Sequence, residues 1–370
     1  MSIQKQHFVL IGGGLAGMML AARFLLAGHS VTVFDSQNPN SASRRAAGMF
    51  NILTGKKHLK TWKSDELLDS LMTFFEIPHF LSLKKHLILL PIYKPFASVS
   101  EYNQVLGKEK TRVEIVENPV MDSVIVNPLG GLKIHGCGWL DMPAFLDDLE
   151  DILKDNFPFQ IYHALIQAEQ IHLPEKKLLF ADKTLPFDGL ILCQGAEKQL
   201  EKLWKLPIIP CKGQTIRIKA AMDLPFILSA GVYILPNGNE HFTVGATYEW
   251  DFEETTPTED GKVQLCAELE ALLKIPYEIT GHFAGIRPTT HDRRPILGTH
   301  PVFSNLHVFG GFGTKGILLA PYFSTILCDY VLGEMQKLGK EYDILRYYHK
   351  EKLPLPEGAT MREIIRKMGD

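Results

Sequence analysis

A glycine-rich turn between an apolar run and an apolar helix constrains this sequence more than any other feature. The run His7–Ile11 leads into Gly12-Gly13-Gly14-Leu15-Ala16-Gly17, and the apolar stretch that follows stops near Gly28. A second run, Ser30–Phe34, ends on Asp35. This order predicts a dinucleotide-binding βαβ unit, because such units consist of a strand, a G-x-G-x-x-G turn, a helix and a second strand with a terminal carboxylate.

Each residue of this motif has a physical task. Gly12 permits the tight turn, Gly14 lets the backbone approach a pyrophosphate, and Gly17 lets the helix pack closely on the strand. Amide groups at the helix start face the phosphates, and Asp35 is placed to accept hydrogen bonds from ribose hydroxyls. A glycine-rich turn without a ligand is the competing interpretation. The motif itself does not distinguish FAD from NAD.

Composition predicts a globular protein of two domains. The chain has 370 residues, 45% of them apolar, so it can bury a substantial core, which excludes intrinsic disorder. The net charge of −3 argues against a general nucleic-acid binder. The first strand begins too early for a signal sequence, and no eighteen-residue stretch is free of polar breaks. We therefore expect a cytoplasmic protein without a membrane span, and the sequence contains no indication of its oligomeric state.

The rest of the chain predicts α/β and α+β architecture. Segments 86–133 and 212–247 read as strands with turns, and Pro236-Asn237-Gly238-Asn239 predicts a hairpin. Pro143 lies near the start of a helix, and a buried strand ends at Gly195. We predict a Rossmann-like dinucleotide domain and an antiparallel-sheet substrate domain, both discontinuous. Their predicted ranges are 1–80, 137–206 and 283–370 for the first, and 81–136 and 207–282 for the second.

A basic run precedes a helix predicted over residues 59–75. Six basic residues and no acidic one lie between Ser36 and Ser64, namely Arg44, Arg45, Lys56, Lys57, Lys60 and Lys63. This run has two interpretations, a solvated surface or a patch that meets cofactor phosphates or an anionic substrate.

A second G-x-G-x-x-G spans Gly311–Gly316. The following segment, 334–350, reads as polar and helical, so the strand and carboxylate of a second nucleotide domain are missing. The motif instead predicts a turn and helix that return to the first domain. Residues 359–370 predict an extra amphipathic helix.

The order of these motifs resembles that of the D-amino-acid oxidase family of FAD-dependent oxidoreductases, which includes glycine oxidase and sarcosine oxidase. The glycine turn with Asp35 resembles the family's ADP site, and ASRRAAGM resembles its Ala-Ser-x-x-Ala-Ala-Gly-Met segment. The later matches are GWLDMPAFLDDL, LILCQGA, PCKGQTIRI, YILPNGNEHFTVGAT, AGIRPTTHDRRPILG and GFGTKGILLAP. The resemblance covers most of the chain and implies FAD as cofactor and oxidation of an amine as reaction.

The same resemblance implies a cofactor site with residues from both ends of the chain. These residues are Gly12, Gly14, Leu15, Ala16, Gly17, Asp35, Ser43, Arg44, Gly48, Met49, Gly195, Gly313, Lys315, Gly316 and Ile317. No Cys occurs near Arg287 or Lys315 in the sequence, where some relatives attach flavin, so FAD is expected to be non-covalent. The five cysteines form no C-x-x-C pair or His/Cys cluster, which argues against a disulfide framework and a metal site.

Three residues are candidates for contact with the substrate. The resemblance implies that Arg287 pairs with a substrate carboxylate and that Tyr233 lines the same pocket. Because Arg287 precedes a proline, its backbone is biased toward an extended conformation, and its planar fork suits a carboxylate. Alternatives are an ion pair of Arg287 with Asp292 and core packing of Tyr233. Lys315 is a candidate for stabilising reduced flavin, assisting oxygen reduction or binding an acidic group, with solvent exposure as the alternative.

The function that follows from the resemblance is oxidation of a primary or secondary amine, amino-acid-like, by hydride transfer to flavin N5. Dioxygen is the expected acceptor, giving H2O2, and the start of the helix at Gly316 is expected to face the flavin. Alternatives are a dehydrogenase that passes electrons to a quinone or carrier, an enzyme resembling the family's tRNA-modifying oxidase, and a non-catalytic flavin scaffold.

Overall fold

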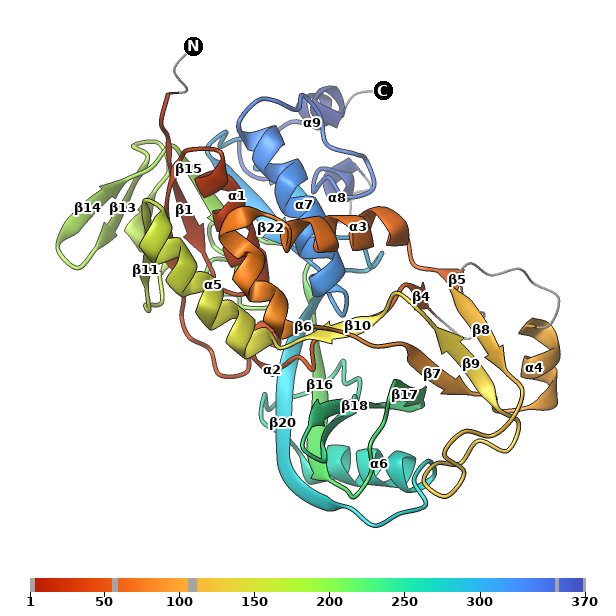
Figure 1. The fold of residues 1–370 in the computed structure, drawn as a ribbon. Coiled ribbons are helices and arrows are strands. Elements are labelled where there is room, and N and C mark those ends of the chain that lie inside the picture. Colours follow the sequence, from red (N-terminus) through yellow and green to blue (C-terminus); the bar gives the residue numbers. More distant parts are fainter. Residues whose placement is uncertain (1–3, 55–58, 106–111, 350–352, 369–370) are drawn as a thin grey trace.

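The first strand of the chain lies in a six-stranded sheet (Figure 1). The protein was studied as a computed structural model that describes residues 4–54, 59–105, 112–349 and 353–368. Neighbouring strands of this sheet are parallel except for the last pair, which is antiparallel. In spatial order its strands are β11 (Phe159–Tyr162), β2 (Ser30–Phe34), β1 (His7–Ile11), β15 (Gly189–Leu192), β22 (Leu306–Gly310) and β21 (Ile296–Thr299).

Both faces of this sheet are covered, as the unbroken apolar sequence of β1 requires. Successive side chains of a strand point to opposite faces. Accordingly, Phe8 and Leu10 belong to one buried cluster, whereas Val9 and Ile11 belong to another. The Rossmann-like architecture predicted from the sequence is therefore confirmed.

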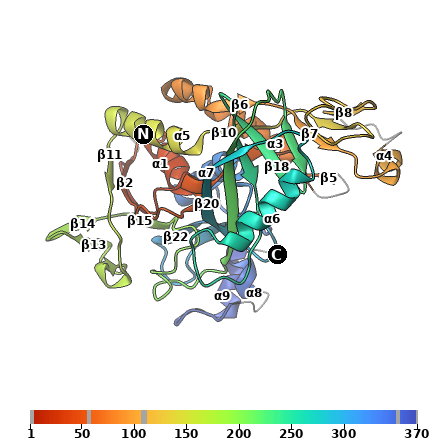
Figure 2. The same cartoon turned by 90° about the horizontal axis from the view of Figure 1, so that it is seen from below.

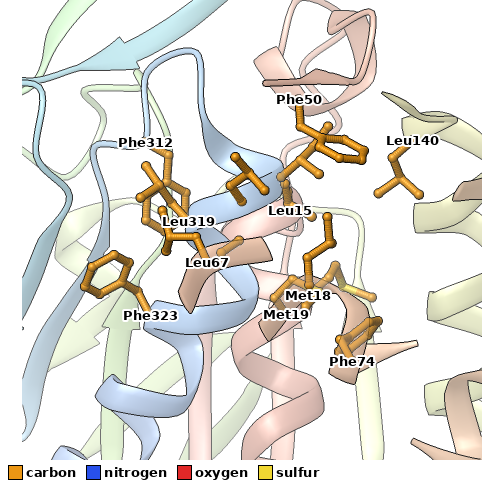
Figure 3. Packing of buried hydrophobic residues seen from close by; sticks show 14 of the residues in the cluster. Leu15, Met18, Met19, Phe50, Leu67, Phe74, Leu140, Phe312, Leu319 and Phe323 are labelled. Carbon is orange, nitrogen blue, oxygen red and sulfur yellow. The ribbon is translucent and has the colours of Figure 1, made fainter. Parts of the chain in front are cut away.

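Three helices pack together on the first face. Figure 3 shows Leu15 and Met18 of the first helix, Leu67 of the second and Leu319 of the third in one apolar cluster. The third helix contains Pro321, which is buried. These helices are α1 (Leu15–Leu26), α3 (Ser64–Phe74) and α7 (Gly316–Val331). A fourth helix, α5 (Met142–Asn156), flanks α1 in Figure 1 and begins at Asp141, whose side chain accepts a hydrogen bond from the amide of Ala144.

The second large sheet has eight strands, and helix α6 (Glu259–Glu270) crosses one of its faces (Figure 2). Leu265 and Leu269 of α6 pack against Ile216 and Val244 of the sheet. In spatial order the strands are β20 (Glu278–Thr289), β16 (Ile209–Lys219), β19 (His241–Gly245), β18 (Val232–Gly238), β17 (Ile227–Ala230), β7 (Ile92–Pro95), β9 (Gly131–Ile134) and β8 (Val113–Val116). The predicted hairpin is confirmed as β18 and β19.

Smaller elements complete the described chain. One three-stranded sheet comprises β3 (Met49–Phe50), β10 (Gly138–Leu140) and β6 (Leu87–Leu89). Another comprises β12 (Ile171–His172), β13 (Lys177–Phe180) and β14 (Lys183–Pro186), and a two-stranded sheet comprises β4 (Leu53–Thr54) and β5 (Leu59–Lys60). The remaining helices are α2 (Ala42–Arg45), α4 (Val99–Val105), α8 (Arg346–His349), α9 (Met361–Met368) and the 3₁₀ segments η1 (Pro78–His86) and η2 (Ala168–Gln170).

The chain passes between the two large sheets four times, namely between β2 and β7, β9 and β11, β15 and β16, and β20 and β21. The strands of each sheet fall within the ranges predicted for the two domains, except that β20 runs across the predicted boundary at residue 283. The domain boundaries themselves stay a prediction. Among the described residues, no helix combines the length and apolar character that crossing a bilayer requires.

Two helical predictions were wrong in detail. The predicted helix 59–75 begins only at Ser64, because residues 59–60 pair as a strand with β4. The segment 334–350 was expected to be polar and helical, but only Arg346–His349 is helical. Arg346 is buried there, and its guanidinium donates hydrogen bonds to both carboxylate oxygens of Asp292 and to three backbone carbonyls. Buried side-chain hydrogen bonds, rather than helical periodicity, therefore shape this segment.

Candidate cofactor and substrate site

The strand order of the parallel sheet places the candidate site. The chain runs outward from β1 to β2 on one side, and β15 lies on the other side of β1. In such sheets ligands bind at this switch point, outside the carboxyl ends of the strands. The glycine turn follows β1 at this edge of the sheet and leads into helix α1. Gly195 follows the neighbouring strand β15 at the same edge.

The glycine turn has no room for side chains. A Cβ atom at Gly17 would lie 1.9 Å from the carbonyl oxygen of Gly12, and one at Gly12 would lie 2.4 Å from that of Cys193. Gly12 also has a φ of +111°, which residues with a Cβ rarely adopt. Gly17 thus serves the contact between helix and strand, while Gly12 and Gly14 form a bare surface beside the cavity.

Two polar side chains border this bare surface. The carboxylate of Asp35 lies next to Gly13, where an added Cβ would come within 3.2 Å of its Oδ2, and it makes no side-chain hydrogen bond or ion pair within the described chain. The Oγ of Ser43 accepts a hydrogen bond of 2.9 Å from the amide of Leu15. Both groups can therefore meet ribose or phosphate oxygens that approach the start of α1.

Arg44 is placed differently from what its proposed role suggests. Its backbone borders the cavity, but its guanidinium pairs with the carboxylate of Asp147 on α5 and donates to the carbonyl of Pro143. A phosphate would have to compete with Asp147 for this cation. The role of Arg44 in cofactor binding stays a prediction.

A single cavity of about 860 Å³ joins the glycine turn to the second large sheet. This volume is within the range typical of ligand sites. Gly17 and Lys315 are the only two predicted site residues that do not line it. Those that do are Gly12, Gly14, Leu15, Ala16, Asp35, Ser43, Arg44, Gly48, Met49, Gly195, Tyr233, Arg287, Gly313, Gly316 and Ile317.

Strand register explains why Arg287 and Tyr233 meet in this cavity. Directly opposed residues on neighbouring strands point to the same face of a sheet. Arg287 on β20 opposes Cys211 on β16, and Gly213 and Thr215 follow on the same face of β16. Thr215 opposes Gly245 on β19, and Gly245 opposes Tyr233 on β18. The glycines leave this face of the sheet open toward the glycine turn of the first sheet.

Arg287 lies flat across the sheet. A Cβ at Gly213 would lie 2.1 Å from its Nη2, so the guanidinium covers the Cα of this glycine. Its Nη1 donates to the carbonyl of Thr247 over 3.0 Å, and its Cζ lies 4.5 Å from the ring centroid of Tyr248. Asp292, the alternative partner considered for Arg287, pairs with Arg346 instead. Within the described chain, Arg287 has no carboxylate partner.

Tyr233 lies on the same face, with its hydroxyl next to Gly245, where an added Cβ would come within 2.7 Å of it. Burial raises the pKa of Tyr233, the charge of Arg287 lowers it in part, and Tyr248 raises it further. The phenol is therefore neutral at physiological pH, and it can donate a hydrogen bond to a ligand in the cavity.

Lys315 caps helix α7 outside the cavity wall. Burial lowers the pKa of Lys315, and the nearby charges of Arg294 and Arg293 lower it further. The Arg294 guanidinium lies 4.1 Å from the ring centroid of Trp62, over which Lys63 also lies. The next two residues, Gly316 and Ile317, line the cavity.

Several functional candidates were missed by sequence reasoning. Tyr248, Thr247 and Gly213 form the surroundings of Arg287. The register against β16 shifts by one residue between Gly245 and Thr247, so simple alternation along the hairpin would not have pointed to Tyr248. Gln194 lines the cavity, and its buried Oε1 has no hydrogen-bond partner within the described chain, which marks it as an acceptor for a ligand.

No group of three His, Cys, Asp or Glu side chains in the described residues could hold a metal ion.

Two cysteines lie closer to the site than the sequence suggested. Cys193 lines the cavity, and the Sγ of Cys211 lies 3.9 Å from Nη1 of Arg287. The absence of a Cys near Arg287 in the sequence does not extend to space, because β16 and β20 pair across a long separation in sequence. Burial raises the pKa of Cys193, so its thiol is a poor nucleophile.

The chain is similar to a family of known proteins. The model of a family described as FAD dependent oxidoreductase matches residues 7–330. Glycine oxidase from Pseudomonas aeruginosa is 34% identical over 133 residues, which are 35% of this chain and 36% of that protein. A tRNA 5-methylaminomethyl-2-thiouridine biosynthesis bifunctional protein from Idiomarina loihiensis is 26% identical over 215 residues, which are 55% of this chain and 35% of that protein.

The fold is also found among solved structures. The crystal structure of glycine oxidase from Geobacillus kaustophilus has a TM-score of 0.75 at 20% identity, covering 96% of this chain and 100% of that one. The matched part spans only about a third of the length of the two curated relatives, so their activities are not transferred with the match. The family match, by contrast, extends over most of this chain. The chain therefore belongs to the FAD dependent oxidoreductase family.

Proposed function

We propose that this protein oxidises the amine of a substrate that also carries a carboxylate. The observation that carries the proposal is the state of Arg287. Its guanidinium borders the cavity, is oriented by Thr247 and Tyr248, and has no acidic partner within the described chain. A planar guanidinium with free N–H groups is suited to bidentate binding of a carboxylate.

As a member of its family the protein uses FAD, and the described residues fit the dinucleotide half of that cofactor. The glycine turn excludes side chains where a pyrophosphate would approach, and the Asp35 carboxylate beside it has no other partner. Ser43 and the first amides of α1 would hold phosphate oxygens, and Asp35 would accept from ribose hydroxyls. The unpartnered Oε1 of Gln194 would accept a further hydrogen bond.

The residues of the cavity have distinct roles in the proposed reaction. When bound, FAD would supply the two-electron acceptor for hydride from the substrate α-carbon, and dioxygen would take the electrons from it to give H2O2. Water would then hydrolyse the imine product. Arg287 would fix the carboxylate and thereby the orientation of the α-carbon. The neutral phenol of Tyr233 would donate to the same end of the substrate. The first amides of α7, at Gly316 and Ile317, would favour negative charge that develops beside them.

Anaerobic bleaching of the flavin tests the proposal. The holoenzyme is mixed with glycine, sarcosine, D-amino acids, proline and larger secondary amines, and we expect at least one carboxylate-bearing amine to remove the oxidised flavin absorbance. Arg287→Ala should weaken its apparent affinity ten- to hundred-fold, as expected for a lost charged hydrogen bond. Arg217→Ala is the matched control, because Arg217 stands on the neighbouring strand β16 and does not line the cavity. Bleaching only by amines without a carboxylate would contradict the proposal.

We also propose that FAD is held without a covalent bond. The thiol of Cys193 is buried and protonated, and Cys211 is buried beneath Arg287. Acid precipitation should therefore release all of the yellow colour into the supernatant. Yellow precipitated protein would show a covalent link.

The electron acceptor separates the oxidase from a dehydrogenase. Under air, an oxidase releases one H2O2 per substrate oxidised, whereas a dehydrogenase that serves a quinone or carrier releases little. We expect stoichiometric H2O2, measured with a coupled peroxidase. Turnover only with an added quinone would assign the protein to the dehydrogenases.

An RNA-linked amine is the second candidate substrate, favoured by the similarity to the tRNA-biosynthesis protein. The basic run that supported it is less free than its sequence suggests, since Arg44 pairs with Asp147, Lys60 with Asp65, and Lys63 lies 3.8 Å from Glu66. Lys56 and Lys57 lie outside the described residues. Retention of the protein by immobilised tRNA that weakens steeply with salt would support this candidate, and we expect none near physiological salt.

A further inference from the structure

The segment that follows β19 continues as an additional pairing partner of β16. The amide of Lys212 donates to the carbonyl of Glu249 and the amide of Glu249 to that of Lys212, both over 2.9 Å. One step further, the amide of Thr247 donates to the carbonyl of Gln214, and the amide of Gln214 donates to Oγ1 of Thr247. Residues 247–249 are thus held in strand-like register against β16.

Side chains on the face turned toward α6 form a buried polar network around Glu249. The Lys212 side chain is 1% exposed, and its Nζ lies 3.1 Å from Oε2 of Glu249. The other carboxylate oxygen, Oε1, accepts from Nε2 of Gln214 over 2.6 Å and from Oγ1 of Thr247 over 3.0 Å. Gln214 in turn packs against Gly261 of α6, where a Cβ would lie 2.3 Å from its Nε2.

This network keeps Glu249 ionised. Burial opposes ionisation of this carboxyl, but hydrogen bonds from Gln214, Lys212 and Thr247, with the charge of Lys212, outweigh burial and lower the pKa of Glu249. Only one partner of this ion pair, Lys212, is fully buried, and the Glu249 side chain is 27% exposed. An ion pair whose burial is costly is a weak source of stability compared with apolar packing. A role for the pair follows instead from the opposite face of the segment.

Alternation along residues 247–249 connects the network to the substrate side. Because successive residues of an extended segment point to opposite faces, Tyr248 faces the cavity while Thr247 and Glu249 face α6. The ring of Tyr248 packs on the Arg287 guanidinium, and the carbonyl of Thr247 accepts its Nη1 hydrogen bond. Two of the contacts that orient Arg287 thus come from the short segment that the network holds from its other face, while a third, to Sγ of Cys211, comes from β16 itself.

We propose that the Lys212–Glu249 ion pair, with Gln214, is a positioning device for the substrate arginine. The pair does not touch the substrate; it holds the Thr247 carbonyl and the Tyr248 ring in place, so that the guanidinium of Arg287 meets a carboxylate in a preset orientation. This inference rests on the proposed function, in which Arg287 binds the substrate carboxylate.

The test uses the holoenzyme and glycolate, a small carboxylate that lacks the reacting amine. The change in the flavin spectrum on adding glycolate measures its binding. Glu249→Gln and Lys212→Met are each expected to raise the Kd for glycolate about tenfold. The rate of flavin bleaching at saturating substrate and the retention of FAD should stay within twofold of wild type. Lys274→Met is the matched control. Lys274 follows helix α6 closely in sequence and forms an ion pair with Asp122 at the surface, outside the network around Glu249.

A double-mutant cycle distinguishes positioning from general weakening of the fold. In an Arg287→Ala background, Glu249→Gln should have no further effect on glycolate binding, because the residue that it positions is absent. An equal tenfold effect in both backgrounds would overturn the inference. If either single variant is unstable, the double variant Lys212→Met/Glu249→Gln, which leaves no isolated buried charge, replaces it and should show the same tenfold loss.

The outcomes for the two proposals differ. If Arg287→Ala binds glycolate with wild-type affinity, the proposed function fails. If Arg287→Ala weakens binding but Glu249→Gln and Lys212→Met do not, the proposed function stands and the positioning role is refuted.

Discussion

Adding one methyl group at Gly213 should disable Arg287 without disturbing the fold. In Gly213→Ala the new Cβ would lie 2.1 Å from Nη2, 2.2 Å from Cζ and 2.4 Å from Nη1 of Arg287, all far inside van der Waals contact. Gly213 does not have the positive φ that only glycine adopts readily, so its backbone accepts alanine. The guanidinium, at the end of a flexible side chain that borders the cavity, is therefore the group that moves.

The magnitude follows from what the displaced guanidinium loses. A shift of about an ångström or more breaks the alignment of a charged hydrogen bond to the ligand, which contributes about 1.5–3 kcal/mol. The Kd for glycolate should accordingly rise about ten- to hundred-fold, while the melting temperature and FAD content stay near wild type. Flavin difference spectra measure the first quantity, and thermal unfolding of the holoenzyme measures the second.

A second background makes this prediction specific. In Arg287→Ala, the methyl group at residue 213 has no guanidinium to displace, so Gly213→Ala should add nothing to the loss. Wild-type affinity of Gly213→Ala for glycolate would refute the idea that Arg287 acts from its position across this glycine. A loss of the same size in both backgrounds would show that the methyl group acts on something else.

Three further predictions concern the cofactor site and the carboxy-terminal segment. Gly17→Ala should abolish FAD retention, measured by flavin absorbance after gel filtration, because its Cβ would lie 1.9 Å from the Gly12 carbonyl oxygen; a yellow variant would contradict the packing described. Lys315→Met should change the rate of flavin reoxidation by oxygen less than twofold in stopped flow, since Lys315 does not line the cavity; a large decrease would restore its role in oxygen reduction. Asp343→Asn should stabilise the protein against urea at pH 8 but not at pH 4. Burial raises the pKa of Asp343 to about 6, partly offset by a hydrogen bond from Leu345 and by Arg346. The native state then binds the proton more tightly than the unfolded state, so wild-type stability falls as pH rises from about 4 to about 6, by up to about 3 kcal/mol; equal stability of both proteins at pH 8 would refute this.

Local patterns explain which features could be predicted. The glycine turn, the strand on either side of α1 and the β18–β19 hairpin all depend on residues near one another in sequence, and the structure has them as expected. The surroundings of Arg287 were not predictable in this way. Cys211 and Gly213 reach it through pairing of β16 with β20, a register that no local periodicity specifies.

The error in segment 334–350 has a physical cause. The segment has helical polarity, but among its described residues only Arg346–His349 is helical. Arg346 is fixed there by hydrogen bonds that its buried guanidinium donates to Asp292 and to the carbonyls of residues 294, 295 and 343. Lys315 was expected at the flavin from the resemblance, whereas in the structure it is half-buried and does not line the cavity. Its role stays a prediction. For segment 334–350, Asp292 is a partner distant in sequence that no local pattern reveals.

The repeated passage of the chain between its two large sheets has a consequence for synthesis on the ribosome. The first strand, β1, emerges early, but its neighbour β15 begins only at Gly189 and the next strand, β22, only at Leu306. Helix α7, whose first residues line the cavity, starts later still, at Gly316. A nascent chain therefore exposes apolar strand edges of this sheet until β22 has left the exit tunnel. We expect the cavity to be complete, and FAD to bind tightly, only after α7 has followed.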